Sequence, residues 1–442
     1  MTVARPAAPV APPVPLRDAA PGPGDGWQRL TRIVALVALV MFGMRREIYQ
    51  EISTAHVAGL LLLPMWLPAP RRFWGARTIL VVGAVALGLG LWLAWLSAAD
   101  HSISRGVLIQ NMALLSYLIL GIGLFLWART LMPDWQVSLA FGFGLVLSAA
   151  PGNAQYAGNP WKYGLGITGA VIVLSLAAKT GRRWVEVVAC VGLGISFAAV
   201  SGRSAFGVLM LTAAIVGLMA VTRRPDGRRR WFPVVAALVV GFVAAYNIGV
   251  AALVEGYLGE ASQERTVRQI ATSGNVLVGG RPEMAATIAL MESRPWGLGP
   301  GVAANLDDIL VAKTAMAELN YDPNNGYVER YMLGARSTLH SITGDMWIRF
   351  GIPGLAFVLV FVIILVRELA IGIRLRSASA LVVYSCLWTL WSMFFEPMSS
   401  AVALMLVAAG LTLQRVPDRV EEADWVGAVR ARPAGSGATT AP

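Results

Sequence analysis

Long stretches without a charged residue alternate with short polar segments along most of the chain. The uncharged runs are 52–70, 78–99, 106–128, 135–161, 163–178, 187–202, 204–222, 231–254, 350–366, 377–395 and 397–414. A helix that crosses about 30 Å of hydrocarbon needs about 17–25 mostly apolar residues, and most of these runs reach that length. The pattern therefore predicts an all-α, polytopic integral membrane protein.

Two local features adjust the number of helices. The run 33–44 is short, but it becomes long enough if its helix begins near Trp27, with Arg29 and Arg32 at the membrane interface. The segment 151–160 (Pro-Gly-Asn-Ala-Gln-Tyr-Ala-Gly-Asn-Pro) has the composition of a turn, so the helices on either side end there. We expect about twelve transmembrane helices.

The charged residues between the runs favour one orientation. One predicted side holds both chain ends and the short basic loops around Arg71, Arg129, Lys179, Arg223 and Arg367. It carries 23 basic and 10 acidic residues, a net +13, and the other side carries 13 basic and 15 acidic residues, a net −2. Basic loops stay on the cytoplasmic face. We therefore expect a multi-pass protein of the inner (cytoplasmic) membrane with both termini cytoplasmic, and no nucleic-acid partner behind the total charge of +11.

The chain then divides into five predicted parts. They are a cytoplasmic tail over 1–26, helices 1–9 over 27–254, an external loop over 255–345, helices 10–12 over 346–414, and a cytoplasmic tail over 415–442. The first 26 residues contain seven prolines and no apolar core, which is typical of a disordered tail. Cys190 and Cys386 lie inside predicted spans, and we do not expect them to form a disulfide.

The external loop, between helices 9 and 10, is too long to be a simple connection and has the pattern of a helical domain. Pro282 can begin a helix that runs through Ser293, and Arg294-Pro295 ends it. Glycines at 297, 299 and 301 predict a flexible turn. A second helix follows, with its apolar residues on one face toward protein or membrane: Leu306, Ile309, Leu310, Met316 and Leu319.

Three external residues are candidates for chemistry, and each also has a simpler role. Arg203 opens a membrane helix, either as an interfacial anchor or as a two-pronged donor to phosphate. Arg281 opens the loop helix, either as a solvated charge or as a phosphate contact aided by the helix N-terminus. His340 lies just before the tenth helix, either as a structural residue or as a base for a sugar hydroxyl.

The remaining polar candidates are interpreted as structural. His56 and His101 have no distinctive neighbours in the sequence. Asp307 and Asp308 are adjacent, and adjacent carboxylates on a helix point about 100° apart, so a solvated face is expected rather than a metal site. No His, Cys or carboxylate cluster has metal-ligand spacing and no phosphate-binding loop is present, so we expect neither a metal nor a cofactor.

Four features together form a recognisable pattern. The turn Ser201-Gly-Arg-Ser-Ala-Phe206 enters a helix, and Gly280-Arg281 is followed by Ala289-Leu290 and Pro295-Trp-Gly-Leu-Gly299. His340-Ser341 lies eleven residues before Gly351-Ile-Pro-Gly354. With about twelve helices and one large external loop, this order resembles the O-antigen ligase and O-antigen polymerase-like family of polytopic membrane glycosyltransferases. The family often has an aromatic residue after the loop arginine and Asn after the histidine, where this chain has Met284-Ala285 and Ser341.

The resemblance implies a reaction on the outer face of the membrane. Such enzymes move a glycan from a polyprenyl-diphosphate carrier to a glycan or glycolipid acceptor, with inversion and without a metal. By analogy Arg203 and Arg281 would bind the diphosphate, and His340 would be the general base or would orient the acceptor. Arg330, Arg336 and Glu329 are second-line candidates because they are close to His340 in the sequence.

Other functions stay open at this point. A polymerase of the same superfamily would join carrier-linked repeat units, and the sequence does not identify the acceptor that separates it from a ligase. A lipid-linked glycan transporter or flippase would carry polar residues at mid-membrane depth, whereas the predicted spans are almost free of charge. A glycosyltransferase with an acidic metal motif in its first external loop is disfavoured, since loop 45–51 has no paired Asp.

Overall fold

The computed structural model describes residues 25–148, 158–200, 202–222, 233–236, 282–334 and 336–416, with a few isolated positions between 254 and 270. This part of the chain is mostly helical and contains one two-stranded antiparallel ribbon, β1 (Glu47–Tyr49) and β2 (Ile52–Ser53). The helical class predicted from the apolar runs is confirmed.

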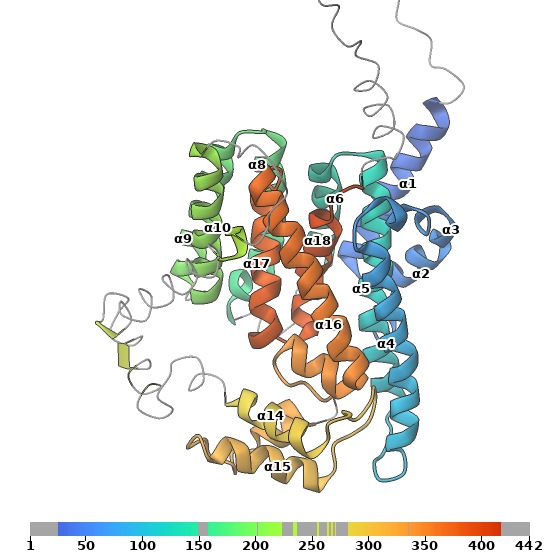
Figure 1. Cartoon of the computed structure of the whole chain (residues 1–442), viewed down its shortest axis with the longest axis vertical. Helices are drawn as coiled ribbons and strands as arrows, with labels where there is room; N and C mark the ends of the chain where they lie inside the picture. Colours follow the sequence, from blue (N-terminus) through green and yellow to red (C-terminus); the bar gives the residue numbers. More distant parts are fainter. Residues whose placement is uncertain are drawn as a thin grey trace, which may run out of the picture.

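Ten of the described helices form an upright bundle (Figure 1). They are α1 (Asp25–Met44), α4 (Ala76–Ser97), α5 (Arg105–Leu131), α6 (Asp134–Ser148), α8 (Gly166–Lys179), α9 (Arg183–Ala199), α10 (Arg203–Val221), α16 (Ile342–Leu375), α17 (Ala380–Phe395) and α18 (Met398–Thr412). The central helix α5 packs against α1, α4 and α18, while α9 and α10 pack together at one edge. Because neighbours surround α5, almost every residue of its second half is buried.

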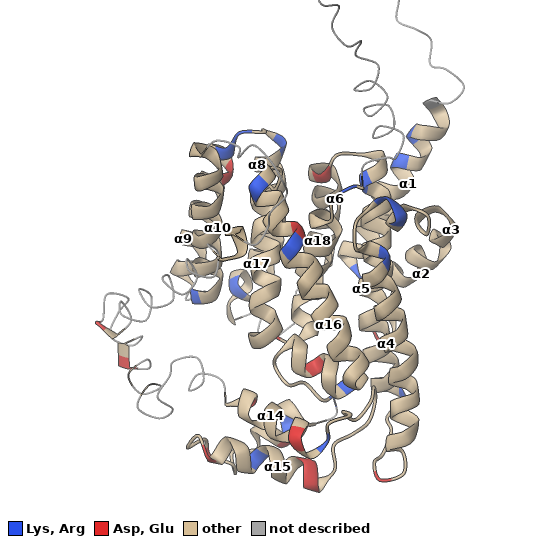
Figure 2. Ribbon diagram, viewed as in Figure 1, with Lys and Arg blue, Asp and Glu red and all other residues tan. Residues whose placement is uncertain are grey.

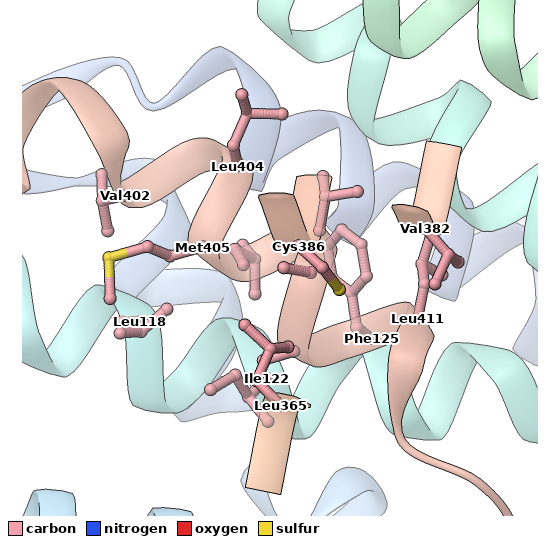
Figure 3. Packing of buried hydrophobic residues seen from close by; sticks show 14 of the residues in the cluster. Leu118, Ile122, Phe125, Leu365, Val382, Cys386, Val402, Leu404, Met405 and Leu411 are labelled. Carbon is pink, nitrogen blue, oxygen red and sulfur yellow. The ribbon is translucent and has the colours of Figure 1, made fainter. Parts of the chain in front are cut away.

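The bundle core is apolar and closely packed where α5, α16, α17 and α18 meet. Figure 3 shows Phe125 of α5 beside Cys386 and Val382 of α17 and Leu411 of α18. The Phe125 ring also packs edge-on against Phe141 of α6, with 5.2 Å between the ring centroids. Both cysteines are buried and free, as the sequence predicted.

Six described helices are long and apolar enough to cross a membrane, by length and composition. They are Gly26–Met44, Ala76–Ser97, Arg105–Leu131, Trp161–Lys179, Arg203–Val221 and Ile342–Leu375. This composition is that of a membrane protein, but the number is smaller than the twelve expected. Part of the difference has a simple origin, because α6, α9, α17 and α18 are shorter than 18 residues and most of the predicted span 231–254 lies outside the described residues.

The predicted span 52–70 is not one helix. It is divided into α2 (Thr54–Leu61), α3 (Leu63–Trp66) and the 3-10 turn η1 (Ala69–Arg72). Prolines at 64, 68 and 70 cause the breaks, because proline has no N–H to continue a helix. His56 closes the first turn of α2 by accepting the Ser53 N–H at 3.0 Å, which confirms its structural role.

Helix α16 is broken at one glycine. Gly351 has φ 61° and ψ −147°, a backbone conformation essentially restricted to glycine. A Cβ at this position would lie 2.3 Å from the carbonyl oxygen of Trp296. Pro353 follows two residues later and brings no N–H into the helix. The hydrogen-bond ladder of α16 is therefore interrupted between its first segment, which ends at Phe350, and the longer segment that follows.

The break connects α16 to the glycine-containing segment 297–301. The Ile348 carbonyl accepts two hydrogen bonds, from the N–H groups of Leu298 and Gly299, both at 2.9 Å. Gly299 also lies against α4, where a Cβ would come within 2.6 Å of the Ala94 nitrogen. Every residue of 297–301 is buried. The expectation of a flexible turn is wrong, because these glycines permit close approach of backbones instead of motion.

Residues 282–334 and 336–341 form a compact helical unit at one end of the bundle, which we call the cap (Figure 1). It contains α14 (Glu283–Ser293), α15 (Leu306–Ala317) and the π-helical turn η3 (Val328–Met332). The predicted loop helix from Pro282 to Ser293 is confirmed. The cap has its own apolar core, which includes Ala286, Leu290, Leu298, Ala312, Met316, Val328 and Met332.

The buried face of α15 differs from the prediction. Asp308, Ala312 and Met316 are buried, at intervals of four residues, whereas Leu306 and Leu310 are exposed. The prediction is right for Met316, but it also placed Leu306 and Leu310 on this face and left out the acidic Asp308.

Charge is distributed unevenly along the bundle. The described chain begins and ends at the end of the bundle opposite the cap (Figure 1). Basic residues outnumber acidic ones at that end. Acidic residues are more frequent in and around the cap than at that end (Figure 2). The predicted basic loops around Arg71, Arg129, Lys179 and Arg367 therefore lie at one end, and the loop around Arg223 lies outside the described residues.

Replacement of Gly351 by alanine tests the break in α16. Gly351→Ala places a Cβ against the Trp296 carbonyl in a backbone region that alanine avoids, and we expect a loss of at least about 2 kcal/mol in the free energy of unfolding. Gly207→Ala is the control, because a Cβ at that helical glycine meets no atom within 4 Å. Thermal unfolding of the purified protein in detergent measures both variants, and equal midpoints would contradict the assignment.

Candidate functional site

His340 lies in the loop that leads from the cap into α16. Its backbone is left-handed, with φ 55°, which is uncommon for a residue other than glycine. Ser341 caps α16 by accepting the Gly344 N–H at 3.0 Å. The imidazole packs edge-on against Tyr327, with 5.9 Å between ring centroids. Neither ring nitrogen forms a hydrogen bond with a described residue, and Nδ1 is buried.

The buried carboxylate of Asp345 fixes the backbone of this loop. Asp345 is fully buried and accepts the N–H of Leu339 at 2.8 Å and the N–H of Met398 at 3.0 Å. Arg349, one turn later, lies 3.4 Å from the same carboxylate and donates to the Ser337 carbonyl at 2.9 Å. The backbone on the N-terminal side of His340 is therefore fixed to α16 and to the start of α18.

The cap holds the other side of His340. Tyr327 donates its hydroxyl to Glu283 at 2.7 Å, so the first turn of α14 is joined to the residue that packs on the imidazole. Thr287 of α14 lies close to Gly344 of α16. A Cβ added at Gly344 would come within 3.2 Å of the Thr287 methyl group. Tyr327, the residue before η3, thus links the partly buried imidazole of His340 to the first turn of α14.

The structure places the predicted arginines differently. Arg203 is exposed at the first residue of α10 and makes no hydrogen bond or ion pair with any described residue. A tight turn precedes Arg203, and it is closed by a hydrogen bond from the Gly202 N–H to the Phe197 carbonyl at 2.8 Å. Arg281 lies outside the described residues. Within the described ranges, no contact brings Arg203 and His340 together.

The second-line candidates fall into two places. Arg336 donates to Gln110 of α5 at 3.0 Å and lies 3.4 Å from Glu51, so it joins the loop before His340 to the bundle. Glu329 forms an ion pair with Lys313 of α15, and the hydrogen bond from Lys313 lowers the pKa of the Glu329 carboxyl group. Arg330 is exposed on η3.

Sequence reasoning missed a charged network that fixes the cap. His101 lies between Asp100 and Asp308, with its ring nitrogens at 2.7 and 2.9 Å from their carboxylates. Arg294 pairs with Asp308 and lies 3.2 Å from Asp100. The hydrogen bond from His101 lowers the pKa of Asp100, and Arg294 adds to this effect. Burial opposes the charge of Arg294, but its bonds to Asp308 and Asp100 outweigh burial and raise its pKa.

Two expectations are corrected by this network. Asp308 is not on a solvated face, because it is only 2% exposed, and His101 is a buried partner of two carboxylates. Asp308 also forms a capping box with Asn305, since each side chain accepts the N–H of the other. The spacing Asn305-x-x-Asp308 is the one signal in the sequence that marks this role.

A cavity of about 450 Å³ lies at the opposite end of the bundle. Its lining includes Arg129, Asp134, Glu368 and Arg415. Arg129 is occupied there, because it donates to Asp134 at 2.8 Å and to the Gly410 carbonyl at 2.9 Å. Neither Arg203 nor His340 lines this cavity.

Among the described residues, no group of three or more His, Cys, Asp or Glu side chains is placed to hold a metal ion. The chain matches no protein-family model, no curated protein and no solved structure.

Removal of the Asp308 charge tests the cap network. Asp308→Asn leaves His101 and Arg294 without their buried carboxylate, and we expect a loss of about 2 kcal/mol in the stability of the docked cap, given that Arg294 is partly exposed. Limited proteolysis of the purified protein should then cleave the cap faster. Asp307→Asn is the matched control, because Asp307 is the exposed neighbour on the same helix. Equal cleavage rates for the two variants would refute the role of the network.

Proposed function

We propose that the protein is a membrane glycosyltransferase of the O-antigen ligase-like kind. It transfers a glycan from a polyprenyl-diphosphate carrier to a glycan or glycolipid acceptor, on the outer face of the cytoplasmic membrane, with both termini in the cytoplasm. Support comes from the six apolar helices, the motif order in the sequence and the position of the cap. The observation that carries the proposal is the environment of His340.

In this proposal His340 is the general base. A base needs a ring nitrogen with a free lone pair, and no described residue bonds to either nitrogen of this imidazole. The ring is also held in one place, since Asp345 fixes the preceding backbone and the imidazole packs edge-on against Tyr327. A base held in this way loses little entropy when it meets a hydroxyl group.

The transfer is a single displacement. The acceptor hydroxyl gives its proton to His340 while its oxygen forms a bond to the anomeric carbon. The bond between that carbon and the diphosphate breaks, and the diphosphate leaves with the electron pair. The configuration at the anomeric carbon is therefore inverted. In this proposal Arg203 and Arg281 stabilise the negative charge that develops on the leaving diphosphate. A guanidinium group binds phosphate by two parallel hydrogen bonds.

An activity assay tests the role of His340. Purified protein in lipid nanodiscs, given a synthetic polyprenyl-diphosphate glycan and an acceptor, should release polyprenyl diphosphate at the same rate with and without EDTA. His340→Ala should reduce kcat by at least about a hundredfold, which is the usual effect of losing a general base. Unfolding curves of the two proteins show whether the variant is folded. Full activity of a folded His340→Ala protein would exclude the proposed base.

The same assay tests Arg203. Arg203→Lys keeps the charge and loses the two-pronged contact, and we expect a loss of at least about tenfold in kcat/KM for the donor. Arg105→Lys is the control, because Arg105 is also exposed at the start of a bundle helix, α5. Unchanged kcat/KM in Arg203→Lys would assign this residue to the membrane interface alone.

A further inference from the structure

Buried polar atoms without a hydrogen-bond partner gather near His340. Those in the cap and the first turns of α16, within the described part of the chain, belong to Glu283, Glu329, Ser337, His340 and Arg349. Buried polar atoms in proteins are almost always bonded to protein or water. Several unbonded ones in one region indicate groups that are placed for a ligand.

Tyr327 is the centre of this region. Its hydroxyl bonds to Oε1 of Glu283, and the other oxygen of that carboxylate, Oε2, is buried and unbonded. Glu283 itself is only 9% exposed. The Tyr327 ring touches three other rings, those of Tyr321, Tyr331 and His340, with centroid distances between 5.7 and 5.9 Å. A row of tyrosines thus leads from the surface of the cap to the candidate base.

The outer member of the row is open to a ligand. Tyr331 is 64% exposed although it packs on Tyr327 with an angle of 33° between the rings. An aromatic ring of this kind offers an apolar face for packing and a hydroxyl for a hydrogen bond. This combination suits a sugar ring, which has a face of C–H groups and a rim of hydroxyls.

The negative charges around the row of tyrosines favour an uncharged ligand over an anionic one. Glu283 and Glu329 each present one buried carboxylate oxygen, and Lys313 neutralises only Glu329. Carboxylate oxygens accept hydrogen bonds from hydroxyl groups. They repel phosphate and carboxylate, so this place does not suit the diphosphate of the donor.

We propose that Tyr327, Tyr331 and Glu283 form a binding subsite for an uncharged sugar ring, next to His340. The assignment of that ring to the acceptor rests on the proposed function, since the base must meet the acceptor hydroxyl. Tyr331 stacks on the apolar face of the ring, and Glu283 accepts a hydrogen bond from one of its hydroxyls through Oε2. The subsite selects acceptors whose terminal sugar carries neither a carboxylate nor a phosphate.

A binding experiment without donor tests the subsite. Full-length protein in nanodiscs is applied to a panel of immobilised oligosaccharides, some neutral and others carrying uronic acid or phosphate. We expect retention of neutral members, with affinity about tenfold weaker in Tyr331→Ala and within about twofold of wild type in Tyr331→Phe, which keeps the ring. Trp296→Ala is the matched control, because Trp296 is an aromatic residue of the cap that is 68% exposed and lies outside the tyrosine row.

A second variant tests the charge. Glu283→Gln keeps the shape and the bond to Tyr327 but removes the negative charge, so the preference for neutral over uronic-acid oligosaccharides should narrow by at least about threefold. Preferential retention of anionic members by the wild-type protein, or no retention of neutral ones, would overturn the subsite. Equal affinity of wild type and Tyr331→Ala would also overturn it.

The transfer assay separates the two proposals. If neutral oligosaccharides bind through Tyr331 but no polyprenyl diphosphate is released, the glycosyltransferase function fails and the sugar site stands. If transfer occurs and Tyr331→Ala leaves the KM for the acceptor unchanged, the function stands and the subsite is overturned. A higher acceptor KM in Tyr331→Ala, with an unchanged donor KM, supports both.

Discussion

The break of α16 at Gly351 is the constraint on which the attachment of the cap depends. A continuous helix would use the Ile348 carbonyl within its own ladder, whereas here that carbonyl bonds to Leu298 and Gly299 of the cap. The cap is thus joined to the bundle through backbone atoms, and only glycine at 351 leaves room for the Trp296 carbonyl. This joint fixes the turn at 297–301, between α14 and α15, against the bundle.

Side-chain charges complete what the backbone begins. Asp345 bonds to the loop before His340 and to the start of α18, while Asp308 joins α15 to the loop after α4 through His101. Each carboxylate is buried and connects segments that are far apart in the sequence. Buried charges are costly unless they are paired, so these contacts favour a single arrangement of cap and bundle. The imidazole of His340 is held between the two halves of that arrangement.

The features that depend on local sequence could be predicted, and those that depend on distant contacts could not. Apolar runs are sufficient to recognise the helical class and the basic end of the bundle, and Pro282 with Arg294-Pro295 marks the limits of α14. The prolines that divide 52–70 are present in the sequence, but the uncharged run around them predicted a single span. The burial of Asp308 depends on His101, 207 residues earlier, and no local pattern reports that contact. The place of Arg281 relative to His340 stays a prediction, since Arg281 lies outside the described residues.

The interval between His340 and Gly351 has a geometric meaning. Only residues 342–350 of this interval are helical, because His340 is left-handed and Ser341, the N-cap of α16, is extended. This short helical segment therefore separates the loop that carries the imidazole from the joint at Gly351. Insertion or deletion of one residue within it would rotate that loop by about 100° about the helix axis relative to the joint at Gly351. The length of this segment, as much as the identity of its ends, decides whether the base meets its substrate.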